Sequence, residues 1–445
     1  MLPVDVEISL LSEYTYSKVA NNLILSPLLP VEASASTGIF MYGHGQQRAL
    51  AGPELAGINY PVDMANPRHL SDRVSSIDVS GIRRAFQLGA DLENPINLSI
   101  GQPDFPVPGV MKEAAIDAIQ SDLNGYTLTT GHPPLLKAIS THLEKDINWN
   151  CGSDDLDLMI TSGTSGALLL SFMAMLNPGD EVVIADPYFV VYPTLGPMTG
   201  SSIVYCDTYP DFRMTAERVE SCLTDRTKLV LVNSPANPTG VILNDEELKD
   251  LVDLCSSRDI LLVSDEIYDL FTYPEHLDSG GRCPSPARHT KDMLLIRGFG
   301  KNYGCTGWRL GYAAGPSWLI AEMAKLQQYT FVCAPSMAQA GATRSFEIDM
   351  GPEIGEYHAR SMMIHEALGD ITTVSSTAGA FYAFIEVPGK LGCSATEFCE
   401  RAIEHNLILI PGAVFSQRDT HVRISYACER TKLAQGLDIL RDMMS

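Results

Sequence analysis

Five short apolar runs recur between turn signals in the middle of the chain, and they constrain the fold more than any other feature. The runs are LMIT at 158–161, EVVIA at 181–185, KLVLVNS at 228–234, ILLVS at 260–264 and MLLIR at 293–297. None alternates polar and apolar residues, which is typical of strands that are covered on both faces. Helical patterns separate them, such as DEELKDLVDLCSS. Repeated strand–helix–strand units predict a large α/β domain with a mostly parallel sheet.

Segments on either side of these runs complete the predicted secondary structure. Helical patterns occupy 110–121 and 133–145, and the second begins with proline in its first turn, where a missing N–H costs nothing. Later in the chain, GAFYAFIEV at 379–387, LILI at 407–410 and HVRISYA at 421–427 are typical of strands. This later set predicts a smaller α+β unit beside the large three-layer domain.

The predicted division of the chain has four parts. Residues 1–75 mix Pro, Gly, Ser and Ala with short apolar pieces and show no sustained period. They are either an extension that packs on the surface or on a neighbouring subunit, or the result of a start assigned too early, with the true start near Met64. We expect an N-terminal arm with part of the small domain at 76–120, the large domain at 121–330 and the small domain at 331–445.

Composition excludes several classes of partner. The 445 residues carry 31 Lys and Arg against 54 Asp and Glu, a formal net charge of −23, so nucleic acid and anionic membrane surfaces are poor partners. The ten cysteines form no C-x-x-C pair, which argues against a metal site and for reduced thiols in the cytoplasm. No basic leader and no long apolar run occurs, so we expect neither a signal peptide nor a transmembrane helix.

Polar side chains follow the apolar runs, at the edge where open α/β sheets bind ligands. The turn SGTSG after the first run offers free backbone N–H groups and the hydroxyls of Thr164 and Ser165. These suit either a phosphate-sized anion or an ordinary helix cap. The segment DPYF after the second run places one aromatic ring, Tyr188 or Phe189, against a planar ligand or in the core.

The next three runs each end in a different polar group. Asn237, on the turn PANPTG, offers an amide that either binds a ligand or closes an Asx-turn. Asp265 lies at the end of an apolar strand, and buried carboxylates are rare without a cation or a strong donor. Lys301 is enclosed by glycines and followed by Arg309. Desolvation and nearby cations would lower the pKa of this lysine, as a Schiff-base amine requires.

Each of these groups alone has an ordinary structural explanation, but the complete set is specific. An anion site, an aromatic ring, an amide, a carboxylate, an amine and an arginine follow successive strands. Together they describe a pocket for a planar, phosphorylated aldehyde with a cationic ring. The cofactor that fits this description is pyridoxal 5′-phosphate.

Eight segments, in this order, make the chain resemble the class I/II aminotransferases, the fold-type I pyridoxal-phosphate enzymes typified by aspartate aminotransferases. The segments are INLSIGQPDFPVP, GYTLTTG, TSGTSGA, DPYFVVYP, NSPANPTG, SDEIYD, GFGKNYGCTGWRLGY and HVRISYA. The resemblance implies an enzyme that moves an amino group from an amino acid to a 2-oxo acid through a Schiff base on Lys301. It also implies the fold-type I architecture.

The resemblance further implies roles for the residues around the cofactor ring. Lys301 would also shuttle the proton between the substrate's α-carbon and the cofactor. Asp265 would pair with the pyridine nitrogen and keep it protonated, so that the ring accepts electrons. Asn237 and Tyr268 would bind the ring's 3-oxygen, and Phe189 would stack on the ring face.

The phosphate and the substrate would be held by a second set of residues. The resemblance implies a phosphate site at Gly163, Thr164 and Ser165, with Arg309 as a charged clamp. Tyr126 matches a tyrosine that reaches the phosphate of the neighbouring subunit, which implies a homodimer with a shared active site.

The substrate's α-carboxylate would lie between two segments that are far apart in the sequence. Arg423 matches the arginine that grips this carboxylate in a bidentate pair. Gly101 lies on the loop that closes over it, and Asn237 would also contact the substrate.

Two places depart from the family pattern. The family's S-x-S-K motif has hydroxyls where this chain has Gly298 and Gly300. The phosphate would lose donors there unless Arg297 or an ordered water replaces them, and serine at 298 would raise cofactor affinity if nothing does. His132 stands beside the usual loop glycine, either as a surface residue or as a substrate contact.

Two other functions stay open at this point. On the same scaffold, a carbon–sulfur lyase or an aminocyclopropane-carboxylate-synthase-like enzyme begins with loss of the same α-proton. A regulator that uses the fold as a sensor would need a DNA-binding module, and residues 1–70 carry neither a basic patch nor a helix-turn-helix pattern. The choice of amino acid is also open, because Arg423 accounts only for an α-carboxylate.

Overall fold

The structure is a computed structural model, and it describes residues 69–77, 81, 92–153 and 155–445. Helix α1 (Asp72–Ser75) is the first described element. The predictions for residues 1–68, including the alternative start near Met64, lie outside the described residues. The four-part division of the chain stays a prediction.

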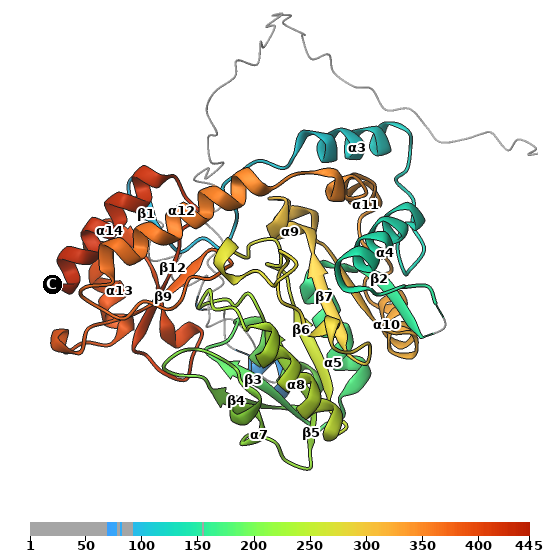
Figure 1. Cartoon of the computed structure of the whole chain (residues 1–445), viewed down its shortest axis with the longest axis horizontal. Coiled ribbons are helices and arrows are strands. Elements are labelled where there is room, and N and C mark those ends of the chain that lie inside the picture. Colours follow the sequence, from blue (N-terminus) through green and yellow to red (C-terminus); the bar gives the residue numbers. More distant parts are fainter. Residues whose placement is uncertain (1–68, 78–80, 82–91, 154) are drawn as a thin grey trace, which may run out of the picture. The chain divides into compact units, whose positions relative to one another are not determined.

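A seven-stranded sheet forms the centre of the large domain (Figure 1). Its strands are β2 (Leu156–Ser162), β3 (Glu181–Asp186), β4 (Ser202–Asp207), β5 (Thr227–Asn233), β6 (Leu261–Asp265), β7 (Leu294–Gly298) and β8 (Leu310–Pro316). The strand order is β2-β8-β7-β6-β5-β3-β4, and only β8 runs antiparallel to its neighbours. The predicted mostly parallel sheet is confirmed.

The strands β4 and β8 did not emerge from the sequence. The sequence of β8, LGYAAGP, is dominated by glycine and alanine, so its apolar signal is weak. The strand β4 lies at the edge of the sheet, next to β3 alone. Edge strands are covered less completely and carry a less continuous apolar run.

Helices surround both sheets of the described chain. Beyond α1 they are α3 (Gly109–Gln120), α4 (Pro133–Ile147), α5 (Gly163–Met175), α6 (Val191–Thr199), α7 (Ala216–Glu220), α8 (Asp245–Ser257), α9 (Phe299–Asn302), α10 (Ser317–Tyr329), α11 (Ser336–Ala342), α12 (Gly351–Leu368), α13 (Ala395–Glu404) and α14 (Arg430–Met444). The predicted helices at 110–121, 133–145 and 245–257 correspond to α3, α4 and α8. None of the described helices is long and apolar enough to cross a bilayer.

The unbroken apolar runs arise because the large sheet has a core on each face. Along β5, Leu229 and Leu231 pack into the core beneath α5, α6 and α10, whereas Val230 and Val232 pack into the core beneath α4 and α8. Successive side chains of a strand point to opposite faces. Both positions of the alternation are therefore apolar, and three layers result, as predicted.

Local signals place the helix ends. In α8 the side chain of Asn244 accepts from the amide of Glu247, whose carboxylate accepts from the amide of Asn244. This reciprocal cap satisfies two donors that a helix start leaves free. Helix α4 begins at Pro133 and ends at Asn148 in the left-handed conformation.

The small domain is built around a three-stranded antiparallel sheet. Its strands are β9 (Tyr382–Glu386), β11 (Ile410–Pro411) and β12 (His421–Ser425), and β10 (Leu407–Ile408) pairs in parallel with β1 (Ile96–Asn97). Helices α12 and α14 pack together beside this sheet (Figure 1). The pairing of β1 with β10 attaches the segment after residue 95 to the C-terminal part of the chain.

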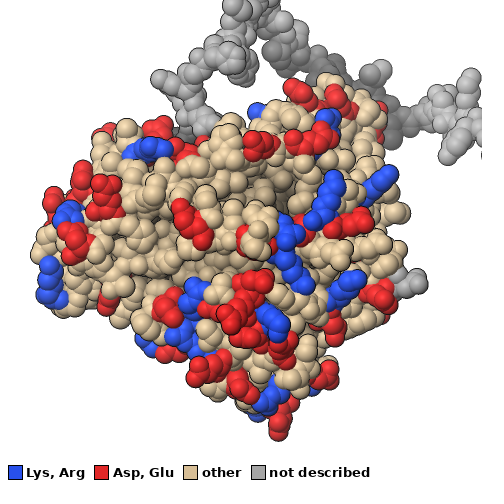
Figure 2. All heavy atoms as spheres, in the orientation of Figure 1, with Lys and Arg blue, Asp and Glu red and all other residues tan. Residues whose placement is uncertain are grey.

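Charged side chains are distributed over the surface of the described chain. On the face drawn in Figure 2, acidic side chains are spread widely, with basic side chains among them.

All ten cysteines lie in the described residues and are free thiols, most of them buried.

Gly311 lets α5 approach the sheet, and a larger residue there should be costly. A Cβ atom at Gly311 would lie 2.7 Å from backbone atoms of Gly163 and Thr164, at the start of α5. We expect Gly311→Ala to destabilise the protein by about 1–3 kcal/mol, because the backbone must move. Denaturant unfolding measures this cost. Gly355→Ala is the control, since its Cβ meets nothing within 4 Å in helix α12. Equal stability of the two variants would contradict the prediction.

Candidate active site

One cavity at the carboxyl ends of the strands collects most of the predicted site residues. It is lined by Gly163, Thr164, Ser165, Phe189, Asn237, Asp265, Tyr268, Lys301 and Arg309. These residues follow β2, β3, β5, β6 and β7 along the chain, so the sheet topology alone brings them together. Their side chains can contact a single ligand.

Asp265 is a buried carboxylate at the end of β6 without a cation among the described residues. Its partners are the hydroxyl of Tyr192, which donates to Oδ2 over 2.9 Å, and the amide of Ile267, at 3.3 Å from Oδ1. Burial raises the pKa of Asp265 to about 6, although these two donors oppose the rise. A carboxylate in this environment will pair with any cation that a ligand offers.

Lys301 lies on the short helix α9, directly after β7. Its ammonium group donates to the carbonyl oxygen of Gly101, and Nζ lies 6.0 Å from the centre of the Phe381 ring. Burial, together with the positive charges of Arg423 and Arg309, lowers the pKa of Lys301 to about 8. The structure thus gives the lowered pKa that the sequence predicted, and for the predicted reasons.

Arg423 projects from β12 of the small domain and is a buried cation without a carboxylate partner among the described residues. Nη1 donates to Oδ1 of Asn237 over 3.2 Å, and Nη2 donates to the carbonyl of Ser99 over 2.8 Å. Its Nε has no partner, and the guanidinium lies between the rings of Tyr382 and Phe415, at 4.6 and 4.5 Å. Burial lowers the pKa of Arg423. This guanidinium can still bind a carboxylate.

The side chain of Asn237 does not close an Asx-turn, which was the alternative that the sequence left open. The backbone amide of Asn237 donates to Oδ1 of Asn233, and Asn233 in turn donates to the carbonyl of Asp265 over 2.8 Å. The turn is closed by Asn233, which leaves the side chain of Asn237 to bind Arg423 and face the cavity.

The start of α5 forms the other end of the cavity. Gly163 has a φ of +68°, which glycine adopts easily. A Cβ atom there would lie 2.8 Å from Nη2 of Arg309, so the guanidinium rests on the first turn of the helix. Nη1 of Arg309 also donates to the carbonyl of Thr306, over 3.3 Å. Free N–H groups, hydroxyls and a guanidinium suit an anion.

The structure distinguishes Phe189 from Tyr188, the two aromatic residues considered for contact with the ligand. Phe189 lines the cavity and packs edge-on against Tyr192, with ring centres 5.6 Å apart. Tyr188 is buried in the core and packs against Tyr205 instead. Tyr268 also lines the cavity, and its hydroxyl lies 3.1 Å from that of Tyr382 behind it.

Other residues considered from the sequence do not line this cavity. Arg423 and Gly101 lie beside it, where they bind the lining residues Asn237 and Lys301. Tyr126 follows α3, and its side chain is 87% exposed. His132 is half-buried at the start of α4, where its backbone amide donates to the side chain of Gln339. Gly298 is buried, and a Cβ atom there would lie 2.7 Å from Ile267 Cδ1, so serine at 298 would have to displace that side chain.

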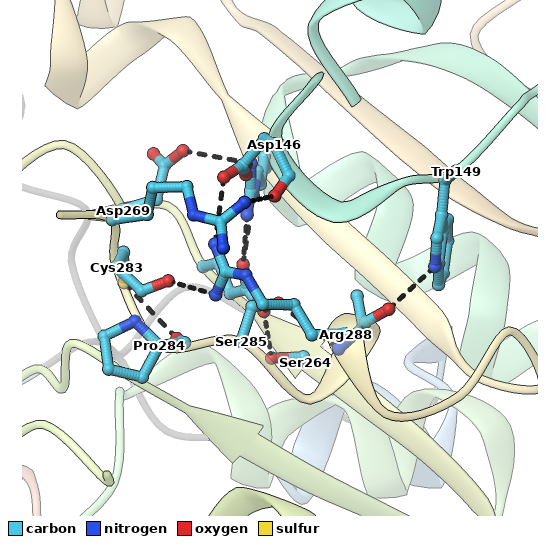
Figure 3. Close-up of polar contacts among 12 residues, drawn as sticks. Asp146, Trp149, Ser264, Asp269, Cys283, Pro284, Ser285 and Arg288 are labelled. Carbon is cyan, nitrogen blue, oxygen red and sulfur yellow. Dashed lines mark hydrogen bonds and ion pairs between the residues drawn. The ribbon is translucent and has the colours of Figure 1, made fainter. Parts of the chain in front are cut away.

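The suggestion that Arg297 replaces the missing phosphate donors is wrong. Successive residues of β7 point to opposite faces, so Arg297 points away from the cavity. Its guanidinium pairs with Glu266, Asp146 and Asp269. Figure 3 shows where Asp146 and Asp269 lie. The three carboxylates hold the guanidinium on the face of the sheet away from the cavity, where it cannot reach a phosphate at the start of α5.

Several residues of the site were not singled out in the sequence. Tyr192, Ser99, Tyr382 and Thr306 contact the key groups or line the cavity. Tyr192 lies three residues after Phe189, a spacing that would have placed it on the same side of a helix. The other three lack such a signal, since a carbonyl, a core tyrosine and a loop threonine are common in any chain.

The comparisons with known proteins identify the family. Residues 93–440 match the family described as aminotransferase class I and II. The chain is 35% identical to the putative aminotransferase YugH of Bacillus subtilis, over 83% of this chain and 96% of that protein. It is 34% identical to the probable aspartate aminotransferase of Methanocaldococcus jannaschii, over 84% of this chain and 99% of that protein.

A solved structure gives the same result. The aspartate aminotransferase of Thermus thermophilus with maleate is 30% identical, has a TM-score of 0.77 and is matched over 84% of this chain and 99% of its own. The chain belongs to the class I and II aminotransferases. The predicted family, the fold-type I architecture and the prediction of an aminotransferase enzyme are confirmed.

The lowered pKa of Lys301 can be measured in the protein without cofactor. We expect its reaction with an amine-selective reagent to follow a titration near pH 8, against about 10.4 for an ordinary lysine. Arg423→Met should move this midpoint upward, because removing a nearby cation favours the protonated amine. Peptide mass spectrometry of the modified protein measures the midpoint for Lys301 in the wild type and in the variant, with the exposed Lys249 as internal control. A wild-type midpoint near 10 would contradict the prediction.

Proposed function

We propose that this chain is a pyridoxal 5′-phosphate-dependent aminotransferase that moves an amino group from an amino acid to a 2-oxo acid. The single observation behind the proposal is that Asp265, in the cavity, and Arg423, bound to Asn237 beside it, are both buried without an opposite charge among the residues that the structure describes. A cationic ring would supply the partner of the first, and a substrate carboxylate would supply the partner of the second.

The residues present fit the proposed cofactor at each of its functional groups. Asp265 suits a protonated ring nitrogen, and Asn237 with Tyr268 suits the ring's 3-oxygen. Phe189 offers an aromatic ring to a planar ligand. The amine of Lys301 suits covalent attachment of the aldehyde, because its lowered pKa leaves more of it neutral near neutral pH.

The reaction would use the same side chains in turn. Bound pyridoxal phosphate supplies an aldehyde that exchanges amines and a ring that accepts electrons from the α-carbon. Arg423 holds the substrate carboxylate and thereby orients the α-carbon. Lys301 Nζ, as a neutral amine, would hold and move the proton that leaves the substrate's α-carbon. Asp265 keeps its charge against the ring nitrogen throughout.

The phosphate group would bind at the start of α5. Gly163, Thr164 and Ser165 supply the helix start, and Arg309 supplies the positive charge. Thr306 also lines the cavity, and its backbone lies against Gly300, where a Cβ atom would be 3.3 Å from Thr306 Cα. We assign to Thr306 the hydroxyl that the family's serine at position 300 would provide.

A homodimer is part of the proposal. Tyr126, Leu128 and Tyr329 are large side chains with exposures of 87%, 62% and 82%. Exposed apolar groups of this size are typical of interaction surfaces. In the proposed dimer Tyr126 reaches the phosphate of the neighbouring subunit, and the two subunits share their active sites.

The cytoplasm is the proposed location of the protein, because its ten free thiols suit a reducing compartment.

The amino acid and the 2-oxo acid are best found by direct assay. We expect the purified protein to bind pyridoxal phosphate and to transfer amino groups from a panel of amino acids to 2-oxoglutarate, pyruvate or oxaloacetate. One molecule of acceptor should be consumed for each amino acid, without release of ammonia. Steady ammonia release without an acceptor would favour the lyase alternative, and a wild-type protein that stays colourless with cofactor would overturn the proposal. Lys301→Ala is expected to lose both the absorbance and the turnover.

The assignment of Thr306 is tested by cofactor affinity. We expect Thr306→Val to weaken binding about 10- to 100-fold, since one hydrogen bond to a charged group is lost. Thr306→Ser should stay near wild type, because it keeps the hydroxyl. Equilibrium dialysis measures both constants, and equal affinity of the valine and serine variants would refute the assignment.

A further inference from the structure

A buried ion cluster lies directly behind the active site, on the other face of the sheet from the cavity. At its centre Arg297 is 2% exposed and Glu266 is fully buried. Nε of Arg297 donates to Oε2 of Glu266 over 3.0 Å, and Nη2 lies 2.9 Å from the same oxygen. The hydroxyls of Ser264 and Ser285 donate to Oε1 of Glu266 over 2.9 and 2.7 Å. Every oxygen of this carboxylate therefore has a donor.

The cluster is joined to both key residues of the proposed mechanism. Ser264 precedes Asp265 on β6 and Glu266 directly follows the strand, and their side chains bind each other on the face opposite to Asp265. Asn302, the residue after Lys301, donates to Oδ1 of Asp269 over 2.6 Å, and Asp269 lies 3.5 Å from Arg297. Arg297 itself belongs to β7, three residues before Gly300.

The charges in this cluster act on Asp265 across the strand. Burial raises the pKa of Asp265, and the negative charge of Glu266 adds to the rise. Burial likewise raises the pKa of Glu266, which the positive charge of Arg297 and the two serine hydroxyls oppose. The Arg297 guanidinium thus counters the one carboxylate that repels a charge on Asp265.

Other ionisable groups face the pair from the surrounding elements. They are His142 and Asp146 from α4, Asp269 after β6, Cys283 and Arg288 around the helical turn at Pro286–Arg288, Tyr312 from β8, and Tyr192 and Tyr268 on the cavity side. Asp146 and Arg288 pair with each other at 2.9 Å, as Figure 3 shows. Arg297 keeps Asp146 and Asp269 as counter-charges when Glu266 is neutral.

We propose that the Arg297–Glu266 ion pair is a positioning device that sets the charge on Asp265 and so tunes how tightly the site holds a cationic ring. The inference rests on the proposed cofactor. It gives Arg297, which has no place in the cavity, a role in the same reaction.

The pair predicts effects of opposite sign for its two members. Glu266→Gln removes a negative charge beside Asp265, so Asp265 ionises at lower pH. Its amide can keep the hydrogen bonds, with the oxygen toward Arg297 and the NH₂ toward the serine hydroxyls. Arg297→Met leaves Glu266 without its counter-charge, so Asp265 ionises at higher pH. A purely structural role would make both substitutions harmful in the same direction.

The experiment measures the dissociation constant of pyridoxal phosphate between pH 5 and 8 by equilibrium dialysis, with thermal unfolding recorded for each variant. In the wild type, affinity should fall on the acid side with a midpoint near 6. The midpoint should move down by about one pH unit in Glu266→Gln and up by about one in Arg297→Met. The double variant Glu266→Gln/Arg297→Met should return toward the wild type. Ionisation of the cofactor phosphate is common to all variants, so only differences between them count.

Arg288→Met is the matched control. It removes a guanidinium from the same cluster, but Arg288 binds Asp146 and the carbonyl of Cys283 and makes no bond to Glu266. It should lower the unfolding temperature and leave the acid midpoint unchanged.

The outcomes separate this inference from the proposed function. A wild-type protein that binds no pyridoxal phosphate overturns both. The ion-pair inference alone is overturned if the wild type binds pyridoxal phosphate but the acid midpoint of the affinity is the same in both single variants as in the wild type. It is also overturned if the midpoint moves in the same direction in both. If Arg297→Met does not fold, the inference is judged by Glu266→Gln alone, because that variant changes charge with little change of shape. An acid midpoint that does not move down in Glu266→Gln then overturns the inference.

Discussion

The structure depends on keeping two opposite charges buried at one site without letting them pair. Asp265 ends a strand of the large sheet, Arg423 projects from the small domain, and neither has an ionic partner among the described residues. Burying an ion without its partner costs several kcal/mol. The rest of the fold must offset this cost, and a ligand that carries both a cationic ring and a carboxylate recovers it. Most of the site can be understood from this constraint.

The fold offsets that cost through the cores on the two faces of the large sheet and through the segment after β1. Alternate residues of each inner strand pack on opposite faces, so the strand ends are fixed from both sides. The segment after β1 then crosses to the cavity, where the carbonyls of Ser99 and Gly101 accept from Arg423 and Lys301. Main-chain dipoles thus partly compensate the cations until a ligand arrives. On the other face of the sheet, by contrast, the buried charge of Arg297 is compensated by side-chain carboxylates.

The errors of the sequence-based prediction have a common cause. Arg297 was considered as a phosphate donor because it lies four residues before Lys301, but strand geometry turns it to the opposite face. Tyr192 was missed, although it donates the main hydrogen bond to Asp265. The residues alone left Tyr188 and Phe189 open and only the family resemblance pointed to Phe189, because the turn after β3 is what sends Tyr188 into the core and Phe189 to the cavity. In each case the direction of a side chain decided the outcome, and direction is set by packing.

The sequence by itself determined that apolar strands alternate with helices in the large domain, the family, and the residue types that meet at the sheet edge. It could do so because burial on both faces leaves unbroken apolar runs, and because the polar residues after them stand at fixed points of the chain. Only the tertiary structure decided which of those groups lack a partner. Whether Asp265 and Arg423 are paired, and how far Lys301 is desolvated, depends on atoms more than a hundred residues away, and such distances follow from packing in three dimensions.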